Sequence, residues 1–233
     1  HHTHTHVDGH DDDIETGSIF RFHPSQQLLP KHKYQHIYAP FAYTLMTYKW
    51  LLEKDFKQVV NYNKSDLFKA KDQSLGMVWT KLIVGKLFHF SVFYALPMLL
   101  GAPWYLVLWG NVVMHVIAGF ILSITFQLAH VVDKAEFPTE EEVQNITNIE
   151  HQMKTTANFA TRNWLVTWYT GGLNFQVEHH MFPTINHIHY PKIAEIVRKT
   201  AAEFELPYNE YRTTISAIKG HFRHLRNMGM QPA

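Results

Sequence analysis

Two long apolar runs, separated by a turn of three residues, constrain the fold of this chain more than any other feature. Residues 82–100 and 104–129 are largely apolar, and a Gly-Ala-Pro turn lies between them. A helix rises about 1.5 Å per residue, so about twenty residues cross the roughly 30 Å hydrocarbon layer of a membrane. The pattern predicts two spans that form a transmembrane hairpin, with both outer ends on one side. The alternative is a pair of buried helices in a soluble bundle.

The polar flanks of the hairpin predict its orientation. The stretch 54–81 before the first apolar run contains six lysines, whereas the turn has no basic residue: Lys54, Lys57, Lys64, Lys69, Lys71 and Lys81. By the positive-inside rule, both flanks are cytosolic. Residues 38–52 mix Tyr, Trp and Lys with a loose helical period, which is typical of a helix on the membrane surface. We therefore predict an all-α fold, namely a membrane-embedded helical domain with a transmembrane hairpin and a cytosolic, histidine-rich helical cap.

Two helices of the cap have local signals. Thr139 and Glu142 have the spacing of a capping box, which predicts a helix that begins there and runs toward Asn158. Pro191 suits the first position of a second helix, which should end before Pro207. That helix is expected to have one apolar face, made of Ile193, Ile196, Val197, Ala201 and Phe204.

Histidine is unusually common in this chain. There are 18 histidines against 21 lysines and arginines together, and there is no cysteine. The lack of cysteine excludes disulfides, thiolate metal sites and cysteine nucleophiles. The formal net charge of +1 gives no reason to expect a nucleic-acid partner. Imidazole is the commonest protein ligand for transition metals, so a metal in this chain would depend on histidine, carboxylate or amide ligands.

The histidines form three groups that the predicted topology leaves on one side of the membrane. They are His1 and His2 with His4, His6 and His10 close behind, then His130 at the end of the second span, and finally the pair His179–His180. Separately, these groups have simpler interpretations: the remnant of an expression tag, a polar helix end and a solvated loop. Together they predict a metal site just outside the bilayer.

The remaining histidines are expected to be structural. His115 precedes His130 by fifteen residues in one helix, hence by about 22 Å, so one metal site cannot use both. We expect His115 to pair with Asn111 inside the bundle, and His89 to be buried in the first span. His32 and His36 have a spacing that permits metal binding on a helix, but such pairs are usually surface residues.

Several segments resemble one family. The segment Gly171–Pro183 contains the motif Gln-Val-Glu-His-His, with Gln176, His179 and His180. This motif is similar to the third histidine box of membrane fatty acid desaturases, in the form typical of the front-end acyl-lipid or acyl-CoA branch. The first thirteen residues resemble the end of the second box and the segment after it. Residues 126–130, 151–159 and 186–191 also resemble family segments.

The resemblance implies an oxidoreductase that uses O₂ and external electrons at two iron ions to introduce a double bond into an acyl chain. It implies five iron ligands: His1, His2, His130, His179 and His180. Gln176 would act just outside these ligands or bind iron through a water molecule, while Asn174, Glu178 and the Asp11–Asp13 run would accept N–H groups of imidazoles. Ligand status does not extend to His4 or His6, which stand where the family has Tyr and Asn. The roles of His151 and His187 stay open.

The resemblance also implies interaction partners, and it implies that the N-terminal part of the desaturase domain is missing from this sequence. The partners would be an acyl-CoA or acyl-lipid substrate, membrane lipid and an electron donor of the ferredoxin or cytochrome b5 type. Because the chain begins at His1 and has no first histidine box, we expect residues 1–233 to be an N-terminally incomplete desaturase domain, inactive in isolation. The alternatives are a related di-iron hydroxylase or sphingolipid-type desaturase, a metal-ion transporter and a soluble metal-storage module.

Overall fold

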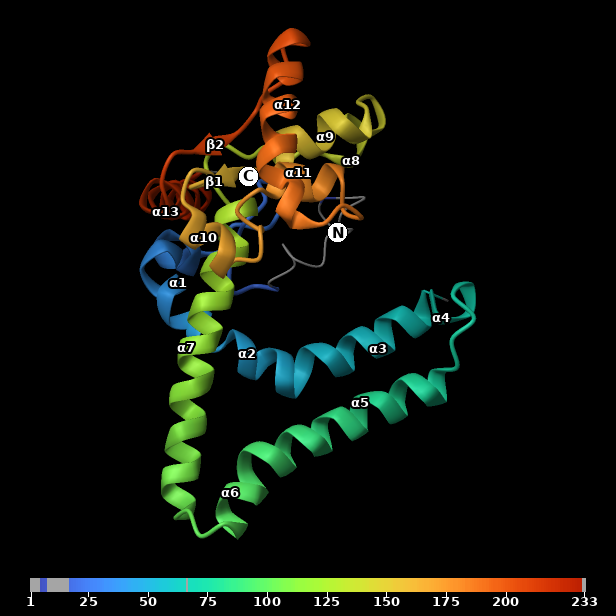
Figure 1. The fold of residues 1–233 in the computed structure, drawn as a ribbon, viewed down its shortest axis with the longest axis vertical. Coiled ribbons are helices and arrows are strands. Elements are labelled where there is room, and N and C mark those ends of the chain that lie inside the picture. Colours follow the sequence, from blue (N-terminus) through green and yellow to red (C-terminus); the bar gives the residue numbers. More distant parts are fainter. Residues whose placement is uncertain (1–4, 8–16, 66, 232–233) are drawn as a thin grey trace. The chain divides into compact units, whose positions relative to one another are not determined.

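The computed structural model describes residues 5–7, 17–65 and 67–231. His1, His2, His4 and the Asp11–Asp13 run therefore lie outside the described residues. The chain forms two compact units. Unit 1 combines residues 1–39 with residues 124–233, and unit 2 is residues 40–123. The fold is mostly helical, as predicted (Figure 1).

Unit 2 is helical throughout its described elements. Helices α1 (Gln35–Thr44) and α7 (Trp104–His130) each run from one unit into the other. The elements wholly within unit 2 are α2 (Met46–Lys49), the π-helix η2 (Trp50–Lys54), α3 (Asp55–Lys64), α4 (Leu67–Ala70), α5 (Leu75–Phe90), the π-helix η3 (Ser91–Ala95) and α6 (Leu96–Leu99).

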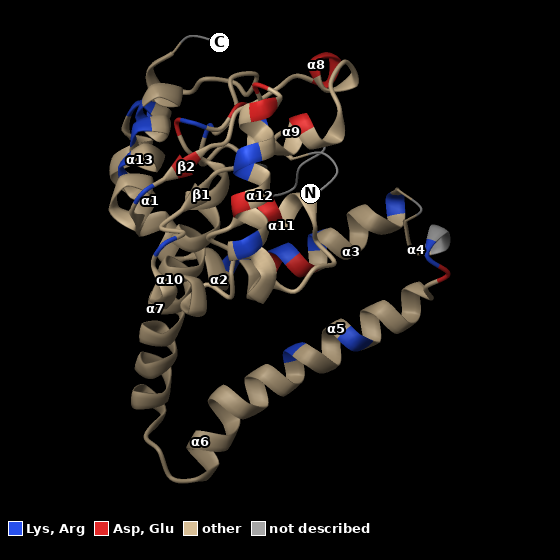
Figure 2. Cartoon of the chain, turned by 45° about the horizontal axis from the view of Figure 1, so that its top comes forward, with Lys and Arg blue, Asp and Glu red and all other residues tan. Residues whose placement is uncertain are grey.

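Two helices are long and apolar enough to cross a membrane. One is the continuous run Leu75–Leu99, made of α5, η3 and α6, and the other is α7. Their 25 and 27 residues correspond to about 37 and 40 Å of helix. The first begins at Leu75, seven residues before the predicted start. Figure 2 shows no Lys, Arg, Asp or Glu along α7, whereas α5 carries two basic residues.

One of the two basic residues of α5 forms an ion pair. Lys86 pairs with Asp55 at the start of α3, and its Nζ lies 3.4 Å from the carbonyl oxygen of Trp50. A cation inside an apolar helix is costly unless it has such a partner. The partner lies on α3, so the polar stretch after residue 55 is helical.

The predicted pairing of His115 with Asn111 is wrong. The amide of Asn111 donates instead to the carbonyl oxygens of Phe93 and Val107, at 2.9 Å each. Nδ1 of His115 lies 3.1 Å from Oγ1 of Thr47, whose hydroxyl donates to the carbonyl oxygen of His115. The ring nitrogen is therefore the donor in this contact. His89, which is half-buried, contacts the ring of His115 at 5.8 Å.

Unit 1 combines short helices with one pair of very short parallel strands. Residue 158 pairs with residue 210, and residue 159 with residue 211. A cluster of apolar side chains around the end of α7 and β1 forms its main core. The elements are η1 (Pro30–Tyr34), α8 (Glu140–Gln144), α9 (Asn148–Thr155), β1 (Asn158–Phe159), α10 (Trp164–Tyr169), α11 (Gln176–Met181), η4 (His187–His189), α12 (Tyr190–Glu203), β2 (Glu210–Tyr211) and α13 (Thr214–Met230).

The capping box at Thr139 is confirmed, but the length of its helix is not. Thr139 accepts from the backbone N–H of Glu142, whose carboxylate accepts the N–H of Thr139. The helix α8 ends at Gln144, and a second capped helix, α9, begins after Thr147. Asn158 lies in β1 and not in a helix, because it pairs with a strand that arrives from near the end of the chain.

The predicted bounds of α12 are confirmed, and only part of its predicted apolar face is buried. Pro191 lies in the first turn, and the helix ends at Glu203, before Pro207. Val197 and Ala201 are buried in an apolar cluster, against which Ile193 packs. Ile196 and Phe204, however, are 66% and 70% exposed, because no described element of unit 1 covers their side of the helix.

A fully buried arginine holds the end of α13. The guanidinium of Arg21 donates to the carbonyl oxygens of Met228 and Gln231, at 2.7 and 2.8 Å. It also donates to the carbonyl oxygens of Gln26 and Pro24 in its own loop. The last carbonyls of a helix have no partner within the helix, so a buried cation at this position satisfies them.

We predict that Arg21→Met lowers the stability of the full-length protein by about 3 kcal/mol, because four carbonyl groups lose their donor while the apolar stem is retained. In a chain of this size the melting temperature in detergent should fall by about 6–12 °C. Arg226→Met, at an exposed position of the same helix, is the control and should shift it by less than about 2 °C. Equal shifts for both variants would contradict this role of Arg21.

Two histidines of α13 are buried in a polar layer. Nδ1 of His221 donates to the carbonyl oxygen of Val131 at 2.6 Å, and Nε2 of His224 donates to that of Phe22 at 2.9 Å. The ring of His224 stacks on Phe137 at 4.7 Å. Burial lowers the pKa of both rings to about 4. Both rings are therefore neutral in the folded protein at neutral pH.

This burial predicts a loss of stability in mild acid. The unfolded chain binds protons at these histidines near pH 6.5, and the folded chain only near pH 4, so stability is full above 6.5 and falls as the pH drops toward 4. Between pH 7 and pH 5 each ring should contribute a loss of about 2 kcal/mol, visible in the melting temperature. His224→Gln keeps a donor toward the carbonyl oxygen of Phe22. Because glutamine does not titrate, the melting temperature of this variant should depend less steeply on pH. His189→Gln, at an exposed position, should leave it unchanged, and an unchanged slope in His224→Gln would refute the explanation.

Candidate metal centre

Three predicted site residues come together at the end of α7. His130 is the last residue of that helix, and α11 provides Gln176 and His180. Nε2 of Gln176 lies 2.8 Å from Nε2 of His130, and the ring centroids of His130 and His180 are 4.9 Å apart. All three side chains are buried. His179 is half-buried beside them, with its ring centroid 5.8 Å from that of His180.

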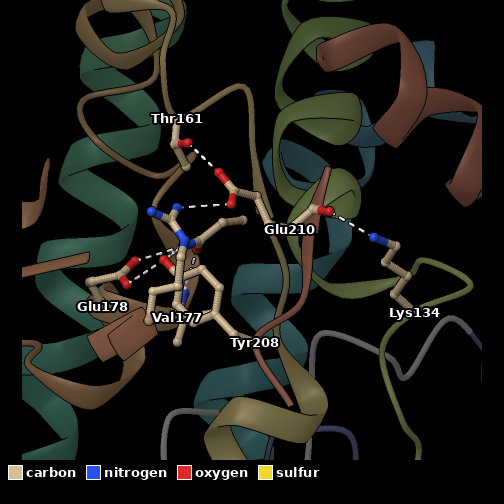
Figure 3. A network of polar contacts seen from close by, with 8 residues as sticks. Lys134, Thr161, Val177, Glu178, Tyr208 and Glu210 are labelled. Atoms are coloured by element: carbon tan, nitrogen blue, oxygen red, sulfur yellow. Dashed lines mark hydrogen bonds and ion pairs between the residues drawn. The ribbon is translucent and has the colours of Figure 1, made fainter. Parts of the chain in front are cut away.

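One buried amide, that of Asn158 in β1, fixes the position of α11. Its Oδ1 accepts the backbone N–H of Val177 at 2.9 Å, and its Nδ2 donates to the carboxylate of Glu178 at 2.8 Å. Tyr208 donates to the other carboxylate oxygen of Glu178 at 2.9 Å (Figure 3). Burial raises the pKa of the Glu178 carboxyl, while the hydrogen bonds from Asn158 and Tyr208 act to lower it. The side chain of Asn158 thus joins α11 directly to the small sheet.

A second carboxylate, that of Glu210, holds the partner strand in place. Arg198 of α12 donates to one of its oxygens at 2.8 Å, and Thr161 donates to the other. Lys134, from the loop after α7, donates to its backbone carbonyl at 2.7 Å (Figure 3). These contacts tie β2 to three other segments of unit 1, so the strand pair that carries Asn158 is anchored from both sides.

Two residues expected to orient imidazoles make other contacts. Within the described part of the chain, both carboxylate oxygens of Glu178 accept from Asn158 and Tyr208 instead of from a histidine ring. The amide of Asn174 donates to Oγ1 of Thr167 at 3.0 Å, and its oxygen accepts from Thr170. Their role in the structure is to hold α11 and the loop before it.

Nδ1 of His180 has two polar partners, and the sequence did not single out either of them. Oγ1 of Thr5 lies 3.2 Å away, and the nearer partner is Gln152. Nδ1 of His180 lies 2.8 Å from Oε1 of Gln152 in α9. The Gln152 amide nitrogen donates to Asn148 at 3.2 Å, and the hydroxyl of Thr5 donates to Oε1 at 3.0 Å. These contacts fix Oε1 as the atom facing the ring, so Nδ1 of His180 carries the hydrogen. Nε2 is then the unprotonated ring nitrogen, which is the form that binds a metal.

Other histidines of unit 1 have contacts that indicate structural roles. His151 donates from Nε2 to the carbonyl of Thr5 at 2.8 Å. His6 contacts the carbonyl of Glu136 at 2.9 Å and has a φ of +62°, in the left-handed region that Asn adopts more readily than most residues. His32 uses both ring nitrogens, accepting from the N–H of Leu29 and donating to the carbonyl of Ser18. A ligand role for His32 is therefore excluded.

The described residues fit part of a metal site. Within the described ranges, no group of three or more His, Asp or Glu side chains is arranged to hold a metal ion. Two imidazoles, His130 and His180, meet there with Gln176, whose buried Oε1 has no hydrogen-bond partner among the described residues. Imidazole nitrogens and an amide oxygen suit iron. The expected ligands His1 and His2 lie outside the described residues, so the structure describes an incomplete donor set.

Comparison with known proteins settles the family. The sequence model of the fatty acid desaturase family matches residues 1–212. This chain belongs to the fatty acid desaturase family. The resemblance found in the histidine motifs is thereby confirmed, and the family is one of membrane oxidoreductases that act on lipids.

Characterised relatives of this desaturase chain act on acyl lipids. It is 33% identical to the sn-1 linoleoyl-lipid 6-desaturase of Arthrospira platensis, over all of this chain and 63% of that protein. It is 35% identical to the acyl-lipid (8-3)-desaturase of Physcomitrium patens, over 99% of this chain and 48% of that one. It is also 35% identical to an sn-1 linoleoyl-lipid 6-desaturase of Synechocystis sp., over 98% of this chain and 64% of that protein. The desaturase chain thus spans about half to two-thirds of the length of these relatives, and no solved structure matches it.

The contact between Gln152 and His180 yields a prediction for the full-length desaturase. Gln152→Met keeps the volume of the side chain but removes the nearer acceptor for the His180 N–H and leaves only Oγ1 of Thr5 at 3.2 Å, so the ring is held less firmly. Loss of such a partner costs about 10–100-fold in metal affinity, and iron retention under increasing chelator measures it. Gln144→Met, at an exposed position in α8, is the matched control. Equal iron retention in the two variants would rule out this role for Gln152.

Proposed function

We propose that the full-length protein is an O₂-dependent membrane desaturase that introduces a double bond into the acyl chain of a lipid. One observation carries the proposal. His130 and Gln176, which are 46 residues apart in sequence, meet beside His180 in a buried site at the end of an apolar helix. Family membership and the names of the acyl-lipid desaturase relatives support the choice of reaction and substrate.

The proposed cofactor is a pair of iron ions. We assign five direct ligands, His1, His2, His130, His179 and His180, while Gln176 would act just outside them or through a water molecule. When bound, the iron pair would supply the oxidising power that unactivated C–H bonds require. In the overall reaction, two hydrogens leave adjacent carbons, and O₂ takes them up with two external electrons and two protons to give two waters.

The protein's own residues prepare the site for this chemistry. Gln152 accepts the proton on Nδ1 of His180, which would leave Nε2 of that ring to bind iron. Tyr190 contacts Nδ1 of His179 at 3.2 Å, which orients the second ring of the pair. The buried contacts of Asn158 with Val177 and Glu178 hold α11 against β1. Burial of His130, Gln176 and His180 keeps bulk water from the oxidant.

The proposal includes the membrane topology and the extent of the domain. Leu75–Leu99 and Trp104–His130 would form the transmembrane hairpin, with the histidine-rich cap on the cytosolic side. Residues 1–233 would be the C-terminal part of the desaturase domain, inactive in isolation because the remaining ligands lie elsewhere in the full protein. Electrons would come from a donor of the ferredoxin or cytochrome b5 type.

Iron content tests the assignment of ligands. The full-length protein is expected to bind two iron ions per chain, and His130→Ala and His180→Ala should each lose most of this iron because each removes a direct ligand. His189→Ala, which removes an exposed histidine, should retain it. Substoichiometric iron in the unmodified protein, or unchanged iron in both ligand variants, would reject the proposed centre.

Product analysis tests the reaction separately. Gas chromatography of fatty acids from a host that expresses the full-length gene should reveal a new unsaturated acyl chain, absent with His180→Ala. A hydroxylated product would instead support the related di-iron hydroxylase.

A further inference from the structure

Helix α10 presents a row of large apolar side chains to the outside of unit 1. Trp164 and Trp168 are 77% and 72% exposed, and Leu165 and Tyr169 are each more than half exposed. With 3.6 residues per turn, these four positions share one face of the helix. We call Trp164, Leu165, Trp168 and Tyr169 the α10 face. Such a concentration of exposed aromatic surface marks an interaction site.

The opposite side of α10 is firmly held, so the orientation of this face is fixed. Val166 packs against the cluster that includes Leu128 and Ala129 of α7. Thr167 accepts from the amide of Asn174 at 3.0 Å. At the start of the helix, Asn163 accepts the backbone N–H groups of Leu165 and Val166. A rotation that buried the indoles would break all of these contacts.

The position of α10 along α7 indicates what covers the face. Val166 packs against an apolar cluster that includes Leu128 and Ala129 from the last turns of α7, and α10 lies beside that end of α7 (Figure 1). Figure 2 shows α10 beside the end of α7 from another direction. Phe126, in those turns, is itself 38% exposed, and α7 is long and apolar enough to cross a membrane. The face therefore lies where a spanning helix would leave the hydrocarbon layer.

The chemistry of the face fits the headgroup layer of a phospholipid membrane. Trp and Tyr settle at that level because each combines a flat apolar ring with one polar group. Arg162 is exposed directly before α10, where its cation can meet lipid phosphates, and the helix itself carries no charged residue. We propose that α10 is an interfacial anchor, with the α10 face inserted among lipid headgroups beside the end of α7.

The anchor would set the height of the candidate metal centre above the bilayer. Only residues 170–175 separate α10 from α11, and Asn174 in this loop holds Thr167 of α10. The indoles and the histidines of α11 therefore belong to one rigid segment. An acyl chain rising from the membrane would meet the site at a fixed depth.

Depth measurements on the full-length protein in phospholipid nanodiscs test the anchor. The described chain has no cysteine, so after removal of any cysteine elsewhere, Trp164→Cys and Trp168→Cys can each carry one spin label. Relaxation by O₂, which concentrates in lipid, is compared with relaxation by a water-soluble nickel chelate. Phe204→Cys is the matched control, because Phe204 is an equally exposed aromatic residue on the C-terminal end of α12, away from α10.

Both α10 labels are expected to give an O₂-to-nickel ratio several-fold higher than the label at residue 204. A ratio equal to that control would place the face in water and overturn the proposal. Low access to both reagents would mean that protein covers the face, which would also overturn it. Iron is measured in the same samples, so failure of the metal assignment and failure of the anchor remain distinguishable.

Discussion

The hydrogen bonds of Asn158 are the contacts on which the candidate site depends. This fully buried amide binds a backbone N–H and a carboxylate of α11 at once, and it lies in a strand pair that Glu210 ties to three other segments. A buried polar group without a partner costs about 1–3 kcal/mol, so the network is stable only when complete. The position of α11, and with it that of His179 and His180, follows from this requirement.

The site brings together segments that are far apart in sequence. His130 arrives on α7, His180 on α11 and Gln152 on α9, and Thr5 arrives from near the N-terminus. Each segment provides a donor or acceptor that another segment needs, so hydrogen bonds between segments orient the histidine rings. The same segment that carries α11 also carries the exposed aromatic face of α10, which would couple the depth of the protein in the membrane to the position of the site.

The sequence predicted the features that depend on neighbouring residues. The Thr139–Glu142 box, the start of α12 at Pro191 and two long apolar helices are all present, since each depends on contacts within a few residues. The histidine motifs also identified the family. Long-range pairing was not predictable: Gln152 gave no signal apart from its place in a family-like segment, and Thr47, the partner of His115, lies 68 residues away. Ile196 and Phe204 belong to the predicted apolar face of α12 but are exposed, since an apolar periodicity does not show which side of a helix other elements cover.

The central claim is that imidazoles from the N-terminal residues, α7 and α11 surround a common pair of iron ions. X-ray absorption at the iron edge of the full-length, iron-loaded protein tests this most directly, because it reports both the atoms bound to iron and the distance to a second iron. The account predicts scattering from imidazole rings together with an iron–iron signal, both weakened in His180→Ala. Isolated iron without imidazole scattering in the unmodified protein would contradict it.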